Sequence, residues 1–188
     1  MPSVMPIMAR ASAPMLRWVV DAGCVISDLA SPRLLEISTI SSAFRNLNAA
    51  SLPSGSVVNL GLSSTLQVVT PARATLANNL VLATAPSTIS LVKSNANAGT
   101  GTQLDFAGVI SGGNALSTLF LNSTMGGDNT TTYRLSGTNT FLGTVQLNRG
   151  SLAVTSNASL GDAANALVVN ANANSQLRFD EPMTFARS

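Results

Sequence analysis

The sequence predicts an all-β fold built from many short strands, and three observations support this prediction. Apolar and polar residues alternate over short runs, most clearly in residues 133–161, and Gly, Asn and Ser separate the runs. Such alternation places one row of side chains on a buried face, and the intervening residues favour turns. The polar residues are mainly Ser, Thr, Asn and Gly, which are poor helix formers. A short apolar pattern also recurs along the chain.

The 188 residues are enough to bury a core, but only 10% of them are charged. Globular domains usually carry about 25% charged residues, so hydroxyls and amides must solvate this surface. The net charge is +2, and the Lys and Arg residues are spread singly from Arg10 to Arg187. A nucleic-acid surface needs clustered cations, and this distribution therefore argues against a nucleic-acid partner.

Reactive side chains are scarce. The chain has no histidine, which removes histidine-based triads and the commonest transition-metal ligand. Cys24 is the single cysteine, so there is no internal disulfide and no multi-cysteine metal site. We therefore predict no catalytic residue, no cofactor and no metal, and we predict that the protein is not an enzyme.

Residues 1–48 differ in composition from the rest and form a separate N-terminal segment. A secretory signal needs an apolar run of ~7–15 residues, and here Pro14, Arg17 and Asp21 interrupt any such run. The sequence as written therefore contains no convincing signal peptide. No segment reaches the ~18 apolar residues of a membrane span.

Within this segment, residues 32–47 are expected to form a short helix that caps the fold. Pro32 after Ser31 suits a helix start. Apolar residues then follow three or four apart, at Leu34, Ile37, Ile40, Phe44 and Leu47. The competing strand interpretation rests on residues 37–40 (ISTI), which are rich in β-branched side chains. The helix is our preferred interpretation, and the strand remains open.

From residue 49 to residue 188 the pattern is that of strands and contains a repeat. Residues 57–60, 80–82 and 167–169 each lead into a polar loop and then into a second apolar strand. These second strands are residues 66–68, 89–91 and 177–179. The first two copies are about 23 residues apart, within the ~20–50 residues typical of solenoids, and the third copy lies several steps further on.

One stretch, residues 133–161, resembles a known family. LSGTNTF at 135–141, then Gly143, LNRGSLAV at 147–154 and ASLG at 158–161 follow one another there. They resemble one full unit of the autotransporter-associated β-strand repeat. In that repeat a Leu-Ser-Gly-x-Asn-Thr-aromatic segment precedes Gly, then Val-Asn-x-Gly-Thr-Leu, then Leu-Gly.

Upstream segments extend the resemblance to residues 55–179. Residues 77–82 and 104–113 are similar to segments that usually precede the unit. The chain departs from the family after ISGG, where residues 116–121 and 126–129 replace the usual Gly-rich run. The departure leaves the register between Leu116 and Tyr133 open.

The resemblance implies a right-handed parallel β-helix, or β-solenoid, over residues 49–188. In the family this fold belongs to secreted bacterial passenger domains, and the repeat assists their passage or folding at the outer membrane. A C-terminal β-barrel translocator normally follows, and the chain contains no run of strands with lipid-facing alternation. The resemblance therefore implies a piece of a passenger, or a remnant with a misplaced start, located at the surface of a Gram-negative bacterium or secreted.

In such a helix each repeat shares its apolar interior with the next. The interior positions that we predict within residues 133–161 are Leu135, Val145, Leu147, Leu152, Val154 and Leu160. Further candidates are Val58, Leu60, Leu82, Ile89, Leu91, Val168 and Leu177. The predicted turn residues are Gly137, Asn139, Gly143, Asn148, Gly150 and Gly161. The glycines are expected at positive φ, and the asparagines in the same region or stacked into ladders.

Four short stretches resemble functional motifs, and we interpret each of them as structural. Asp180 and Glu181 are the single adjacent pair of acids, and we read them as a solvated turn rather than a glycosidase pair. Residues 126–129 (GGDN) resemble one calcium-binding loop, but a calcium roll needs repeated copies. Residues 99–101 and 111–113 lack the Lys and the helix of a phosphate loop.

Three functions follow, in order of preference. The first is a structural stalk of a passenger domain that assists translocation and displays other parts. The second is an adhesin whose Thr- and Asn-rich face contacts glycans or host matrix. The third is a polysaccharide-degrading enzyme on the same fold, which the absence of His and the sparse acids disfavour.

Overall fold

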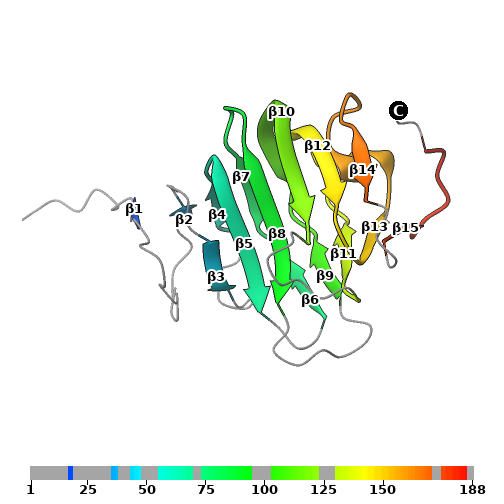
Figure 1. Cartoon of the computed structure of the whole chain (residues 1–188), viewed down its shortest axis with the longest axis horizontal. Coiled ribbons are helices and arrows are strands. Elements are labelled where there is room, and N and C mark those ends of the chain that lie inside the picture. The colour runs from blue at the N-terminus through cyan, green and yellow to red at the C-terminus, as the bar shows by residue number, and fades with distance from the viewer. Residues whose placement is uncertain are drawn as a thin grey trace, which may run out of the picture.

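The computed structural model of the chain describes residues 17–18, 35–37, 43–47, 55–69, 73–94, 103–122, 130–170 and 175–185. Strands dominate this part of the chain (Figure 1), and its one helical element is a single 3-10 turn, η2 Asn157–Leu160. The all-β prediction is therefore confirmed.

Fifteen strands are described, and most of them are short. They are β1 Arg17–Trp18, β2 Leu35–Ile37, β3 Ala43–Leu47, β4 Val57–Leu60, β5 Ser63–Val69, β6 Ala74–Leu76, β7 Asn79–Leu82, β8 Thr88–Ser94, β9 Gln103–Phe106, β10 Ile110–Leu121, β11 Thr132–Leu135, β12 Leu142–Leu147, β13 Ser151–Val154, β14 Leu167–Val169 and β15 Gln176–Phe179. Ser, Thr, Asn and Gly in the connections end these strands, because such residues adopt turn conformations readily.

All the described strand pairs are parallel. The larger sheet has the order β1-β2-β4-β7-β10-β8-β5-β3, with β12 paired to β10 and β14 paired to β12. The smaller sheet has the order β15-β13-β11-β9-β6. From β9 to β15 the chain alternates between the two sheets, so each sheet gains strands as the chain runs from left to right in Figure 1.

The first two copies of the predicted repeat are neighbouring strands. β4 pairs with β7 so that Val58 aligns with Leu80 and Leu60 with Leu82. The third copy does not continue this ladder. β14 pairs with β12, in the part of the sheet that contains β5 and β8.

Two adjacent glycines, Gly112 and Gly113, bend β10 between two sets of partners. Residues before the bend pair with β7, and residues 118–121 pair with β8. Both glycines have positive φ, +79° and +75°. A Cβ atom on Gly112 would overlap the carbonyl oxygen of Leu82, and one on Gly113 would overlap that of Leu142. Glycine is therefore required here both for its conformation and for its lack of a side chain.

The core lies between the two sheets and consists of alternate residues from their strands. Strands β4, β9, β11 and β12 show strict alternation of partly exposed and buried residues. One continuous cluster of buried Leu, Val, Ile, Phe and Tyr side chains joins both sheets. The hydroxyl of Tyr133, on β11, accepts a hydrogen bond of 2.9 Å from the backbone N–H of Lys93, on β8, and so ties the two sheets together.

The predicted helix over residues 32–47 is wrong where the structure describes it, because β2 and β3 are strands. Leu35 aligns with Val58, and Phe44 aligns with Leu66. Pairing to β4 and β5 supplies a ladder of backbone hydrogen bonds that an isolated helix of this length could not match. The strand interpretation is therefore correct for residues 35–37 and 43–47, whereas residues 38–40 of the ISTI run lie outside the described residues.

One predicted interior residue, Val168, is also wrong. Its Cα aligns with that of Gln146 on the outer face of β12, and it is 40% exposed. The neighbouring Leu167 aligns with the buried Val145 and packs partly against the core. An error of one residue moves a strand side chain to the opposite face. Leu177 is partly buried against the core, and the other further candidates are buried.

Candidate functional site

The six interior residues predicted within residues 133–161 are all at most 1% exposed. They come from β11, β12, β13 and η2: Leu135, Val145, Leu147, Leu152, Val154 and Leu160. Leu135 aligns with Val154 across one ladder. Leu121 and Leu147 align across another. They form packed rows rather than the wall of a site.

The predicted turn glycines fall into two groups. Gly143, Gly150 and Gly161 have positive φ, at 140°, 82° and 78°, although Gly143 lies within β12. Gly137 does not have positive φ, so that part of the prediction is wrong. A Cβ atom on Gly137 would overlap the carbonyl oxygen of Gly108, which shows that close packing of neighbouring segments, not a turn conformation, requires glycine here.

Asn139 and Asn148 bridge segments of the chain instead of adopting positive φ. Among the described non-glycine residues only Asn122 has positive φ. Asn139 Oδ1 accepts a hydrogen bond of 2.7 Å from the N–H of Ile110, and its Nδ2 donates one of 2.5 Å to the carbonyl of Ser159. Asn148 Oδ1 accepts hydrogen bonds from Gln146 and Asn170, at 3.0 and 2.5 Å.

Asn165 has the same role, and no local pattern in the sequence predicts it. It is 4% exposed, its Oδ1 accepts a hydrogen bond of 2.8 Å from the N–H of Gly143, and its Nδ2 donates to two carbonyls. Buried amides of this kind satisfy backbone groups that the ladders leave unpaired. These asparagine side chains therefore stabilise the fold.

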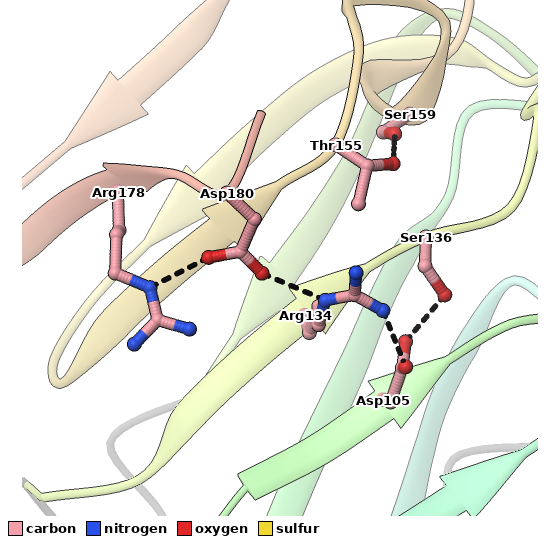
Figure 2. Close-up of polar contacts among 7 residues, drawn as sticks. All are labelled: Asp105, Arg134, Ser136, Thr155, Ser159, Arg178 and Asp180. Atoms are coloured by element: carbon pink, nitrogen blue, oxygen red, sulfur yellow. Dashed lines mark hydrogen bonds and ion pairs between the residues drawn. The ribbon is translucent and has the colours of Figure 1, made fainter. Parts of the chain in front are cut away.

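The most concentrated group of charges is an ion-pair chain on the smaller sheet (Figure 2). Arg134, on β11, bonds Asp105 on β9 at 2.8 Å and Asp180 at 2.7 Å. Arg178, on β15, bonds the other oxygen of Asp180 at 2.8 Å. The hydroxyl of Ser136 donates a hydrogen bond of 2.6 Å to Asp105. Four charges of alternating sign thus cross the sheet from β9 to the end of β15.

The register of the strands explains how the ion-pair chain spans four of them. Asp105, Arg134, Ala153 and Arg178 are aligned on β9, β11, β13 and β15. Ala153, between Arg134 and Arg178 in this row, is small and fully buried, and Asp180, just after β15, bonds both of these arginines. A larger side chain at this position would separate the ion pairs.

The charges hold one another in their ionised forms. Burial acts to raise the pKa of Asp180, but hydrogen bonds from Arg134 and Arg178 outweigh it, and the pKa of Asp180 is lowered. The hydrogen bonds that Arg134 donates to Asp180 and Asp105 raise the pKa of Arg134. An acid held in its anionic form between two guanidinium groups is poorly suited to donate or accept a proton in a reaction.

The structure describes only some of the sequence motifs that resemble functional sites. Asp180 belongs to the ion-pair chain and is not the fully solvated turn residue that we expected, whereas Glu181 is exposed. Cys24 and residues 99–101 and 126–129 lie outside the described residues. Within the described ranges no three acidic or thiol side chains gather as a metal site.

A second surface is the outer face of β5, β8, β10 and β12, which is rich in hydroxyls. The one charged residue of these strands, Lys93, is fully buried. Two rows cross the face, one of Ser63, Thr88, Thr118 and Thr144 and one of Thr65, Ser90, Phe120 and Gln146. The face is therefore uncharged and carries one aromatic ring, that of Phe120.

Comparisons with known proteins return no match: no family model, no curated protein and no solved structure is significantly similar to the chain. In the described part of the chain no helix is long and apolar enough to cross a membrane. The function has to be inferred from the residues of the chain itself.

Proposed function

We propose that the chain is a right-handed parallel β-helix segment that acts as a structural stalk in an autotransporter-like passenger domain. The single observation that carries this proposal is the set of long parallel ladders, in which every described strand pairs only in parallel. Parallel strands need a crossover connection, and repeated crossovers between two sheets suit a solenoid.

The use of the polar side chains supports a structural role. The buried amides of Asn139 and Asn165 bond backbone groups of other segments, and the charges of Asp105, Arg134 and Asp180 bond one another. These groups stabilise the contacts between successive repeats. A stalk needs such contacts along its whole length, since each repeat touches only its neighbours.

The stalk would work outside the cell. In this proposal the chain crosses the outer membrane of a Gram-negative bacterium through a C-terminal β-barrel translocator and folds as it emerges. Each new repeat adds to the ladders already formed, and the burial of its apolar row drives the process forward. The chain then carries other parts of the passenger away from the surface.

A display assay tests the stalk. The chain is placed between an epitope and the barrel of an autotransporter, and surface epitope is measured on intact cells. We expect full display with Gln146→Asp, whose side chain lies on the outer face, and strongly reduced display with Leu147→Asp, which buries a charge. Equal display of the two variants, or no display of the unaltered chain, would contradict the proposal.

The uncharged face favours a second function, binding of a neutral glycan. Hydroxyls and amides on a regular lattice offer hydrogen bonds to sugar hydroxyls, and Phe120 offers an apolar surface for a sugar ring. A glycan array separates the two proposals. Saturable binding that Phe120→Ala weakens would favour an adhesin, whereas a stalk alone binds no glycan.

A further inference from the structure

At one corner of the molecule, connections of different length join the two halves of the larger sheet. Residues 61–62 join β4 to β5, and residues 83–87 join β7 to β8. Within β10, residues 113–117 separate the part that pairs with β7 from the part that pairs with β8. Opposite residues 114–117, β12 has only Gly143. We call these connections, residues 61–62, 83–87 and 113–117 with Gly143, the variable corner.

The strands on both sides of the variable corner keep their register despite these differences in length. Before the corner, Leu82 aligns with Leu60 on one side and with Gly112 on the other. After the corner, one row of aligned residues crosses four strands, and it consists of Ser63, Thr88, Thr118 and Thr144. The fold therefore accommodates extra residues at this corner without a change in its ladders.

The two longest connections at this corner, residues 83–87 and 113–117, form an ordered pair that we call the projection. At its base the buried hydroxyl of Ser87 donates a hydrogen bond of 3.0 Å to that of Ser117. Further out, Asn114 Nδ2 donates one of 3.1 Å to the carbonyl of Thr84. The two segments lie side by side at the upper end of the molecule in Figure 1.

The tip of the projection makes little contact with the core. Leu116 is 77% exposed, the largest value among the exposed large apolar residues of the described chain. Ala85, Pro86 and Ala115 are also exposed, and the projection contains no charged residue. Exposed connections on a rigid scaffold are where proteins carry function and accept inserted chain.

A connection after β9 shows the opposite case. The N–H groups of Ala107 and Gly108 both bond the carbonyl of Leu76, at 2.9 and 3.3 Å. A Cβ atom on Gly108 would overlap the carbonyl oxygen of Asn78. Ala107 is exposed, yet the backbone beside it is packed against the neighbouring segment. Exposure of one residue is therefore not enough to make room for extra chain.

We propose that the variable corner is a position at which the molecule carries inserted or displayed segments, with the projection as its outermost part. The inference deepens the proposed stalk function and rests on it, because a stalk needs a position where displayed parts leave without disturbing its ladders. The entropy of closing a loop grows slowly with its length, so further residues at the tip weaken the fold little.

Insertion of a short peptide epitope with flanking Gly-Ser linkers tests the proposal on the purified chain. One variant carries the epitope between Ala85 and Pro86, at the tip of the projection. The matched control carries the same epitope between Ala107 and Gly108, where the backbone is closely packed. Urea unfolding gives the midpoint of each variant, and antibody binding without urea reports whether the epitope is accessible.

We expect the variant with the insertion after Ala85 to unfold in one transition, with a midpoint close to that of the unaltered chain, and to bind the antibody. The variant with the insertion after Ala107 should lose the transition or unfold at a clearly lower urea concentration. The proposal is overturned by a loss at the first site as large as at the second or larger, by equal tolerance of both sites, or by an epitope that the antibody reaches only after unfolding. Neither measurement involves a cell surface, so a failure here is distinguishable from a failure of the stalk in the display assay.

Discussion

At the scale of single residues, two glycines are required by close contact between neighbouring segments rather than by their own backbone conformation. Gly137 sits against the carbonyl of Gly108, and Gly108 sits in turn against the carbonyl of Asn78. Gly137, Gly108 and Asn78 form a column in which a Cβ atom on either glycine would overlap backbone of the segment about one repeat earlier. The sequence predicts Gly137 as a turn residue, but the partner that excludes a side chain lies about one repeat away and cannot be read from the local pattern.

Gly137→Ala tests this contact. The new methyl group must push backbone aside, so we expect a loss of about 1–3 kcal/mol in the free energy of unfolding, measured by urea denaturation. The control is Thr138→Ala, at an exposed neighbouring position, which should change stability by less than about 0.5 kcal/mol. A Gly137→Ala variant as stable as its control would show that the two segments are further apart than described.

At the scale of elements, the interior strands were predictable and their edges were not. Leu147 and Val154 are buried as the alternation indicated, because both neighbours of their strands are present. Val168 was misjudged because three consecutive apolar residues, 167–169, do not show which of them faces the core. The strands at residues 35–37 and 43–47 were missed because β2 and β3 gain their strand form from pairing with distant segments. The ion-pair chain was also out of reach of local patterns, since Asp105 and Asp180 meet only through Arg134.

The ion-pair chain fixes β15 to the sheet and makes its attachment depend on pH. The pKa of Asp180 is lowered in the folded protein, so its ion pairs stabilise the fold fully above the ordinary carboxyl pKa of about 3.9. That stabilisation is lost as the pH falls below this value and through the lowered pKa. Loss of the charged hydrogen bonds of Asp180 should lower the free energy of unfolding by about 1–3 kcal/mol at neutral pH.

Urea unfolding of Asp180→Asn against the unaltered chain measures this contribution. We expect the variant to be less stable at neutral pH and the difference to shrink towards strongly acidic pH. Hydrogen exchange of the Asp180 amide, which bonds the carbonyl of Val154, should report earlier local opening in the variant. A difference between the two proteins that does not change with pH would mean that the Asp180 charge is not the cause.

At the scale of the whole molecule, the parallel ladders unite the fold and the proposed stalk. Outer-face residues such as Thr88, Thr118 and Thr144 lie in line because β8, β10 and β12 stack in register. The same stacking aligns the buried rows and places the ion-pair chain across four strands. All these consequences fail together if the strands are not parallel and in register.

Disulfide cross-linking between β10 and β12 tests that register most directly. In a Cys24→Ser background, Thr118→Cys with Thr144→Cys pairs two aligned residues, and Thr118→Cys with Gln146→Cys pairs residues that are two positions out of register on the same face. Aligned Cα atoms on neighbouring strands lie within the 4.4–6.8 Å or so that a disulfide spans, and the diagonal pair lies beyond it. We expect rapid intramolecular cross-linking of the first pair and little of the second. Equal cross-linking of both pairs, or preference for the second, would contradict the stacked parallel architecture.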